Sequence, residues 1–247
     1  MTSLSKPSGV LHATALRSPK RTSPRAHVKA MQVEASDSST HRRCLFLHGK
    51  GGNGPKFANA LQPLQDELVS IGLPPVEVVA PTAPHALPGG GYAWWNLAAG
   101  ERSFTAAEFI GFEATLELLR EEVRANGPFD FMVGHSQGAM LAAILLAGRA
   151  GPPCSAPNHV WILQPHVRAI LCGAAWPAPF GAKIEALSPA NVPRTLHCIG
   201  AADNVNPPEM ARKLGGCLGG EVLEHDGGHV VPLTDRDALR KMAEFFS

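Results

Sequence analysis

The sequence predicts an α/β domain of three layers, with a mostly parallel sheet of about six strands. From Arg43 to the end of the chain, short apolar runs alternate with longer helix-like segments. The runs are apolar throughout, so we expect helices to cover both faces of the sheet. In such sheets ligands bind at the carboxyl ends of the strands, and we expect the functional residues there.

Six apolar runs are the expected strands. In chain order they span 44–49, 76–81, 129–134, 168–173, 195–200 and 221–225, and the last is the weakest. Five other segments are typical of helices: 57–72, 105–127, 137–148, 208–216 and 234–247. In the second of these, apolar residues recur at spacings of three and four, the period of one helix face: Phe109, Phe112, Leu116, Leu119 and Val123.

The composition excludes several classes of protein. The 247 residues are 45% hydrophobic and 17% charged, enough for one domain of about 200 residues plus a tail, which excludes a disordered or fibrous chain. The longest apolar run, 139–148, is too short for a membrane span, which needs about 20 residues. The five cysteines form no CxxC pair and several lie in strand-like runs, so we expect reduced, buried thiols and no metal site.

The first 40 residues differ from the rest, and we expect the folded domain to span 41–247. Residues 1–33 contain six Lys or Arg and eight Ser or Thr, with no acidic residue and no sustained apolar region. That composition is typical of an organelle transit peptide rather than a secretory signal. The tripeptides VKA and VEA, near Ala30 and Ala35, resemble chloroplast processing sites, so we expect a disordered segment that directs the protein to the chloroplast or another organelle. The alternatives are a basic arm that binds an acidic surface, and a cytoplasmic protein.

The charge balance argues against a nucleic-acid partner. The whole chain has a formal charge of +1, and because residues 1–33 carry six of the basic groups, the remainder carries about −5. Nucleic-acid binding relies on clustered Lys and Arg that displace counterions from phosphates. Beyond residue 33, acidic residues outnumber Lys and Arg, so this part of the chain lacks the excess of positive charge that nucleic-acid binding needs.

The stretch VGHSQGA, 133–139, places Ser136 in a GxSxG pattern between an apolar strand and a helix. The turn at such a junction is too tight for side chains on either flank, which accounts for Gly134 and Gly138. It projects the serine hydroxyl outward and aims the first amides of the helix at the same spot, where they can stabilise an oxyanion. A serine that only caps the helix would not explain both glycines. We therefore predict that Ser136 is a nucleophile.

A nucleophilic serine needs a base, and the base needs an acid that orients it. In this arrangement they follow in the order serine, acid, histidine, each just past a later strand. Asp203 follows the run 195–200, and His229 lies in a glycine-flanked loop after the last strand. Alternatively, Asp203 only shapes a turn, or His225 is the base, although it lies within a strand-like run.

The second oxyanion donor is expected in the glycine-rich loop after the first strand, LFLHGKGGNG, 45–54. Glycines let a backbone amide approach the substrate closely, and the amides of Lys50 and Gln137 are our candidates. His48 and Gly49 belong to the same loop and are expected beside the substrate, where His48 shapes the loop rather than transferring protons. A phosphate-binding loop is the alternative, but the GxxxxGK[ST] spacing is missing.

Taken together, these ordered motifs resemble those of the FSH family of serine hydrolases, which are compact α/β-hydrolases. The resemblance runs from about Arg43 to Phe246 and includes a Trp pair, 89–97, besides the segments 127–142, 199–207 and 225–232. It implies hydrolysis of carboxylic esters or thioesters by Ser136, His229 and Asp203, without a cofactor. One departure is His135, where the family commonly has Phe, and the insert 151–166 is longer than usual.

The substrate is expected to be a small molecule that carries an acyl ester. Candidates for the wall of an acyl channel are Trp94, Trp95, Leu97 and Phe104, with 89–91 as a flexible hinge, although the two tryptophans would alternatively cover the sheet. His135 is a further candidate for contact with the substrate. Only about 20 residues separate the runs 168–173 and 195–200, too few for a large helical cap, so we expect an accessible pocket for a medium or long acyl ester. An acyltransferase and a ligand receptor on a hydrolase scaffold are the alternatives. The sequence does not define the oligomeric state.

Overall fold

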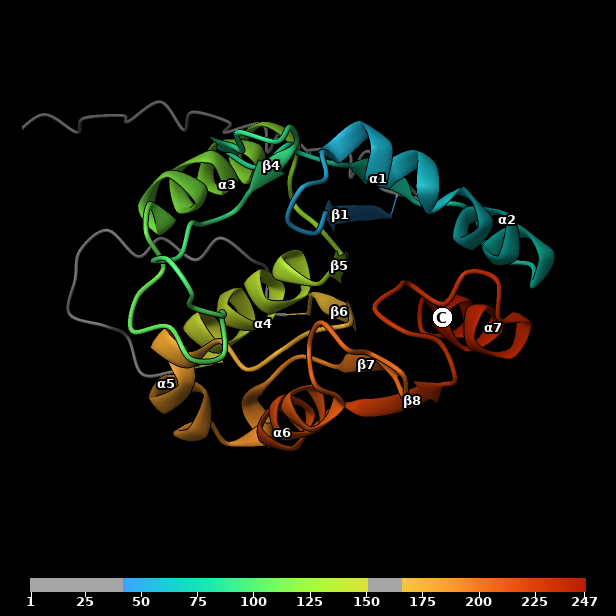
Figure 1. The fold of residues 1–247 in the computed structure, drawn as a ribbon. Helices are drawn as coiled ribbons and strands as arrows, with labels where there is room; N and C mark the ends of the chain where they lie inside the picture. Colours follow the sequence, from blue (N-terminus) through green and yellow to red (C-terminus); the bar gives the residue numbers. More distant parts are fainter. Residues whose placement is uncertain (1–41, 151–165) are drawn as a thin grey trace, which may run out of the picture. The chain divides into compact units, whose positions relative to one another are not determined.

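A computed structural model describes residues 42–150 and 166–247 (Figure 1). The basic segment 1–40 lies outside the described residues, as do Cys154 and nearly all of the 151–166 insert. The expected start of the folded domain at residue 41 therefore stays a prediction.

The central sheet has six parallel strands in the order β2-β1-β5-β6-β7-β8. Their bounds are β1 Arg43–Leu47, β2 Glu77–Val79, β5 Phe131–His135, β6 Arg168–Cys172, β7 Thr195–Gly200 and β8 Glu221–His225. Each coincides with one of the six apolar runs. The expected parallel sheet of about six strands is confirmed, and its pairing brings the carboxyl ends of all six strands to one edge.

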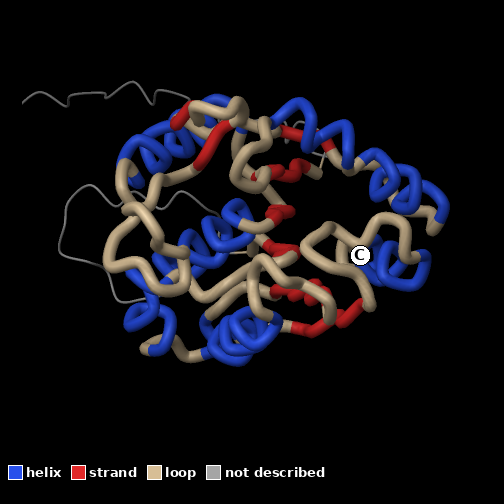
Figure 2. Tube along the Cα trace, viewed as in Figure 1, coloured by secondary structure: helices blue, strands red, loops and turns tan. Residues whose placement is uncertain are grey.

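Helices cover both faces of the sheet. One face carries α3 Phe112–Asn126, α4 Gln137–Ala150, α5 Gly181–Glu185 and α6 Pro208–Leu218, and the other carries α1 Gly54–Ala60, α2 Gln62–Ser70 and α7 Arg236–Glu244 (Figures 1 and 2). Two separate clusters of buried side chains fill the space between the sheet and these two layers. Along β1, Leu45 and Leu47 belong to the first cluster and Cys44 and Phe46 to the second, the alternation that a strand imposes.

Two of the expected helices differ from the structure. The segment 57–72 is two helices, because α1 begins at Gly54 behind the capping side chain of Asn53, and Pro63 lies in the first turn of α2. The segment 105–127 becomes helical only from Phe112, since Gly111 has the left-handed φ of 77° that interrupts a helix. Phe109 is therefore buried in the core from a loop and not from the predicted helix face.

The sequence patterns did not predict a short hairpin of β3 His85–Ala86 and β4 Tyr92–Ala93. Strands of two residues leave no periodicity to detect. The hairpin matters because its backbone holds the glycine-rich loop after β1. The amide of Gly51 donates to the Tyr92 carbonyl at 2.8 Å, and the amide of Tyr92 donates to the Gly52 carbonyl at 3.0 Å.

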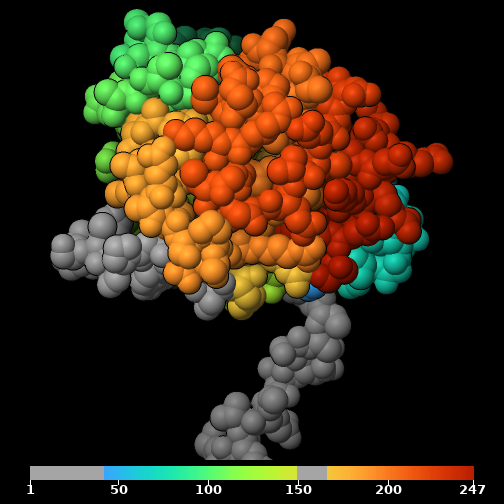
Figure 3. All heavy atoms as spheres, turned by 90° about the horizontal axis from the view of Figure 1, so that it is seen from below, coloured from blue at the N-terminus to red at the C-terminus, as the bar shows by residue number. Residues whose placement is uncertain are grey.

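The connection between β6 and β7 holds only α5 and two 3₁₀ turns, Ala178–Phe180 and Pro189–Asn191. No large helical cap is present in the described part of the chain, as the sequence predicted. Viewed from below, the surface along the β8 edge is made mainly by the carboxyl-terminal part of the chain, drawn orange to red (Figure 3). Of the helices within the two described ranges, none is long and apolar enough to cross a membrane.

Candidate active site

Ser136 occupies a sharp turn between β5 and α4. Its φ is 54°, a conformation that is uncommon for a residue other than glycine. Its amide donates to the Cys172 carbonyl at 2.9 Å, which fixes the turn against the neighbouring strand. The flanking glycines allow the close packing, because a Cβ atom on Gly134 would lie 2.6 Å from the Gly138 carbonyl oxygen, and one on Gly138 would lie 2.0 Å from that of Leu47. Neither position has room for a larger residue.

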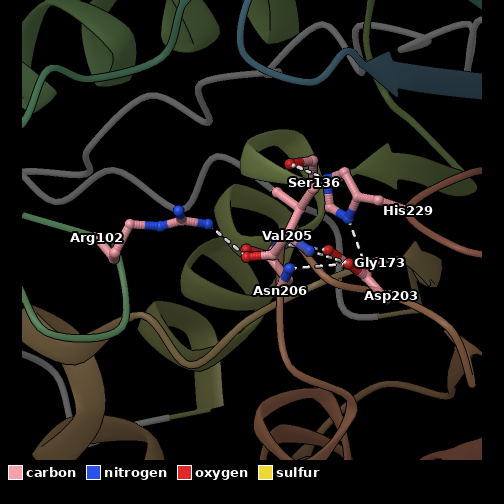
Figure 4. A network of polar contacts seen from close by, with 7 residues as sticks. All are labelled: Arg102, Ser136, Gly173, Asp203, Val205, Asn206 and His229. Atoms are coloured by element: carbon pink, nitrogen blue, oxygen red, sulfur yellow. Dashed lines mark hydrogen bonds and ion pairs between the residues drawn. The ribbon is translucent and has the colours of Figure 1, made fainter.

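Three side chains from three loops meet at this turn (Figure 4). Ser136 Oγ lies 2.8 Å from His229 Nε2, and His229 Nδ1 lies 2.7 Å from Asp203 Oδ2. They follow the carboxyl ends of β5, β8 and β7, the edge at which the fold predicts ligand chemistry. A carboxylate only accepts hydrogen bonds, so Nδ1 carries a proton and Nε2 is left to accept from the serine hydroxyl.

The Asp203 side chain is held by its own loop. Oδ1 accepts from the amides of Val205 at 2.9 Å and Asn206 at 2.8 Å, so Oδ2 is the oxygen that faces the histidine. The side chain of Asn206 donates to the Gly173 carbonyl at 2.8 Å (Figure 4). Asp203 thus both shapes a turn and contacts His229, two roles that the sequence had offered as alternatives.

Two residues that hold this loop were missed by sequence reasoning. Asn206 is 7% exposed and ties the Asp203 loop to the end of β6, and the Asn-rich turn DNVNP was its only signal. Arg102 donates from a distant loop to the Val205 carbonyl (Figure 4), and no local pattern marks it.

His225, the alternative candidate for the base, does not contact Ser136 or Asp203 through a hydrogen bond. His225 is buried within β8, where its Nδ1 atom accepts from the Gly227 amide at 3.2 Å. Burial lowers the pKa of His225, with smaller opposing effects from nearby carboxylates that include Asp203. Its ring therefore shapes the turn that presents His229.

The loop after β1 is fixed by His48, a buried residue. Its Nδ1 atom lies 2.7 Å from the Gly49 carbonyl, and its Nε2 atom accepts from the Ala83 amide at 3.0 Å. Since Nε2 accepts, Nδ1 is the protonated nitrogen. Burial lowers the pKa of His48, so the ring stays neutral. With both nitrogens engaged by backbone groups, His48 shapes the loop and offers the substrate no free polar atom.

The prediction that Trp94 and Trp95 wall an acyl channel is wrong. Both are 0% exposed and belong to the core cluster on the α3–α4 face. Trp94 Nε1 donates to the His48 carbonyl at 2.7 Å, and the Trp95 ring stacks on Phe109 with centroids 4.1 Å apart. The indoles therefore cover the sheet, the alternative interpretation of the sequence.

The Gln137 side chain connects this buried pair to the nucleophile turn. Its Oε1 atom accepts from the Trp94 amide at 2.8 Å, and its Nε2 atom donates to the Trp95 carbonyl at 2.9 Å. Gln137 is the first residue of α4, where backbone amides have no partner within the helix. The side chain thus fixes the start of α4 directly beside Ser136.

His135 lies directly beside the catalytic candidates. Its ring centroid is 4.9 Å from that of His229, and Phe57 stacks on it at 6.5 Å. Burial and, to a smaller extent, the neighbouring His229 lower the pKa of His135 to about 4. A Cβ atom on Gly49 would lie 3.0 Å from His135 Nδ1, so the loop after β1 also packs against this ring.

Two cavities adjoin Ser136 and His229, and Lys50 also lines both. The first, of about 300 Å³, is lined by Lys56, Phe57 and His135, and we call it the basic cavity. The second, of about 380 Å³, is lined by Leu97, Arg102, Gln137, Met140 and Val205. Within the described residues no cluster of His, Cys, Asp and Glu is arranged to hold a metal ion.

Comparison with known proteins shows the family. Residues 38–240 match the family model described as serine hydrolase (FSH1). The chain belongs to this serine hydrolase family. Esterase CG5412 of Drosophila melanogaster is 31% identical over 203 residues, covering 78% of this chain and 69% of the relative. Esterase OVCA2 of Mus musculus is 33% identical over 176 residues, 68% of this chain and 72% of the relative. The chain is therefore an enzyme, a serine hydrolase related to esterases.

Solved structures of the same fold support the architecture. Acyl-protein thioesterase 2 of Zea mays superposes with a TM-score of 0.59 at 21% identity, covering 85% of this chain and 96% of that one. Esterase PE8 gives a TM-score of 0.58 at 21% identity, covering 84% and 92%. The α/β-hydrolase fold predicted from the sequence is confirmed.

Proposed function

We propose that Ser136, His229 and Asp203 form a catalytic triad that hydrolyses carboxylic esters or thioesters through an acyl-enzyme. The observation that carries this proposal is the continuous pair of contacts, 2.8 Å from serine to histidine and 2.7 Å from histidine to aspartate. Nucleophile, base and orienting acid within hydrogen-bond reach are the geometric signature of an activated serine.

In the first half of the reaction, Ser136 Oγ attacks the acyl carbonyl carbon while His229 Nε2 takes the hydroxyl proton. The carbonyl oxygen becomes an oxyanion, and the tetrahedral intermediate collapses by breaking the bond to the alcohol or thiol. His229 gives its proton to that leaving group. Throughout, the Asp203 carboxylate accepts a hydrogen bond from the protonated Nδ1 atom, which keeps Nε2 facing the serine.

In the second half, water attacks the acyl-enzyme carbonyl and His229 takes a proton from it. The bond between Ser136 Oγ and the acyl carbon then breaks, His229 returns the proton to the serine, and a carboxylic acid leaves. The products are one alcohol or thiol and one acid, so no cofactor enters the balance. An acceptor alcohol in place of water would give acyl transfer by the same steps.

For the oxyanion we propose the backbone amides of Lys50 and Gln137. Both residues line the second cavity together with Ser136 and His229. The Gln137 amide opens α4, a helix of 14 residues whose amino terminus carries partial positive charge. Loss of one oxyanion donor in enzymes of this kind costs about 10² to 10³ in turnover.

The cavities bear on the size of the substrate. At about 300 and 380 Å³ they lie at the lower end of the range of roughly 300 to 1,000 Å³ that is usual for ligand pockets. This supports an ester with two short arms better than the medium or long acyl chain expected from the absence of a cap.

A fluorophosphonate probe tests the proposal, because it labels a serine only when a base activates it. We expect labelling of the wild type and none of Ser136→Ala, while Ser70→Ala, an exposed serine on α2, labels normally. Ser136→Ala should also lower kcat on p-nitrophenyl esters by about 10⁶, as loss of a triad serine does. Matched oxygen esters and thioesters, with and without an acceptor alcohol, then separate the three reactions. Absence of labelling in folded wild type would refute the proposal.

A further inference from the structure

The basic cavity carries two unpaired cations beside the candidate nucleophile. Lys50 and Lys56 line it together with Ser136 and His229. Both lysines are exposed, and neither forms an ion pair with any residue in the described ranges. Among the described residues no Asp or Glu lines this cavity. Its charge is therefore positive, although the chain beyond residue 33 is acidic overall.

The polar groups that the cavity leaves free are hydrogen-bond donors. Each lysine offers an ammonium group with three donors and no acceptor. The side chain of Asn53 already uses Oδ1 to accept from the Lys56 amide at 3.0 Å, which leaves its NH₂ group as a donor. Both nitrogens of His48 are engaged by backbone groups, so this ring adds no acceptor.

Part of the cavity wall is apolar. Phe57 and Ala60 line it, and the His135 ring stacks on Phe57 with centroids 6.5 Å apart. Burial lowers the pKa of His135 to about 4, so at neutral pH the ring is an uncharged part of the wall. A ligand that fits this surface has a reacting carbonyl, a short hydrocarbon arm and a terminal group rich in acceptors.

The second cavity differs in character. Glu101 and Arg102 line it together with Met140, so both signs of charge are present. The guanidinium of Arg102 is also engaged, because it donates to the Val205 carbonyl and lies over the Phe104 ring. Lys50 lines this cavity as well, so the basic cavity is distinguished by Lys56 and by the absence of Asp and Glu among its described lining residues.

We propose that the basic cavity binds an anionic arm, a carboxylate or a phosphate, of an ester or thioester whose carbonyl lies at Ser136. This inference rests on the hydrolase function proposed above and names its substrate class. The anion takes no part in bond making. If the acyl arm carries the anion, hydrolysis yields a dicarboxylic or phosphorylated acid. If the leaving arm carries it, hydrolysis yields an anionic alcohol or thiol.

Matched ester pairs test the charge preference. For the acyl arm, mono-p-nitrophenyl glutarate is compared with p-nitrophenyl pentanoate, which has the same number of acyl carbons and no second carboxylate. For the leaving arm, 4-acetoxybenzoate is compared with its methyl ester. The variants are Lys56→Gln and Lys56→Glu, with Lys241→Gln as control, because Lys241 on α7 lines neither cavity. The readout is the ratio of kcat/KM, anionic to neutral, within each pair.

We expect the Lys56 substitutions to change the ratio of kcat/KM for one of the two ester pairs. Lys56→Gln should lower the ratio about threefold to fivefold, the size of one exposed ion pair, and Lys56→Glu should lower it further by repulsion. The neutral esters should keep their kcat/KM within about twofold, and which pair responds identifies the arm. In 1 M NaCl, where the Debye length is about 3 Å, the wild-type preference should shrink toward that of Lys56→Gln.

The outcomes separate this inference from the function on which it rests. If wild type hydrolyses the neutral esters and both ratios are unchanged by Lys56→Gln, the anionic substrate class is wrong and the hydrolase function stands. The same holds if Lys56→Gln lowers neutral and anionic esters equally. If wild type hydrolyses none of the esters and no fluorophosphonate labels it, the hydrolase function itself fails.

Discussion

Replacing Asp203 by Asn changes one oxygen of the carboxylate into an NH₂ group, and the structure decides which one. The amides of Val205 and Asn206 both donate to Oδ1, so the one oxygen that the asparagine side chain keeps must stay at that position. The NH₂ group then occupies the place of Oδ2, 2.7 Å from His229 Nδ1 in the native protein. It donates where the carboxylate accepted, so the imidazole must carry its proton on Nε2, facing Ser136.

In that tautomer His229 no longer accepts the serine proton, and the expected loss is large. Exchange of the orienting aspartate for asparagine lowers kcat by about 10⁴ in serine proteases, which corresponds to about 5 kcal/mol at 1.36 kcal/mol per factor of ten. The loop itself should remain folded, because both backbone bonds to the side-chain oxygen are kept. Thermal stability should therefore change little, whereas Asp203→Ala, which loses those bonds, should lower Tm as well.

The assay is kcat on p-nitrophenyl butyrate across pH, with Tm measured for each variant. Asp226→Asn is the matched control, because Asp226 is an exposed carboxylate in the His229 loop. It should retain wild-type turnover. If Asp203→Asn is folded and keeps more than a tenth of wild-type kcat, Asp203 does not orient the base, and the tautomer argument is wrong.

Three further predictions concern the turn, the buried histidines and the amino terminus. Gly138→Ala places a Cβ atom 2.0 Å from the Leu47 carbonyl, so we expect a loss of more than about 2 kcal/mol of unfolding free energy and a Tm fall of about 4 to 8 °C. On the same helix, Gly148→Ala meets no atom within 4 Å and should raise stability by up to about 1 kcal/mol. Burial lowers the pKa of His135 and of His197 to about 4. Below about pH 6.5, the ordinary His pKa, these histidines are protonated in the unfolded chain but stay neutral in the folded protein. The free energy of unfolding should therefore fall as pH drops from about 6.5 toward 4. By about pH 4.5 each histidine should lower the free energy of unfolding by on the order of 2 to 3 kcal/mol. In urea unfolding, His135→Phe should therefore lose less stability than the wild type over this pH range. An equal loss in the wild type and in His135→Phe would contradict this. Residues 1–40 fused to a fluorescent protein should direct it to chloroplasts in algal cells, and a diffuse cytoplasmic signal would refute that expectation.

The sequence predicted the strands better than the helices, for a physical reason. A strand buried on both faces is mostly apolar without alternation, so β1 and β7 are visible as nearly continuous apolar runs. Helix boundaries depend on single residues. Gly111 delays α3, and Pro63 starts a second helix after α1, although the apolar spacing continues through both places. Periodicity alone does not show such local backbone effects.

In the candidate site too, the sequence predicted some residues correctly and missed or misplaced others. Ser136, Asp203 and His229 were visible because each follows a strand and sits in a turn that its neighbours reveal. Arg102 was not, since its contact with Val205 spans 103 positions and ends on a backbone carbonyl, for which any residue would serve. Trp94 and Trp95 were placed wrongly because aromatic content does not distinguish a pocket wall from a core.

The buried tryptophans nevertheless explain how the site keeps its geometry. Trp94 joins the loop after β1 to the nucleophile turn, because its indole donates to the His48 carbonyl while its amide donates to Gln137. The two candidate oxyanion donors, Lys50 and Gln137, thus belong to segments tied together by one rigid, fully buried side chain and its backbone. A site held within about 0.5 Å needs such support from packed residues. His48 lies two positions before the proposed donor Lys50, and Gln137 directly follows the nucleophile. Both are therefore held in place by Trp94, which is buried in the core.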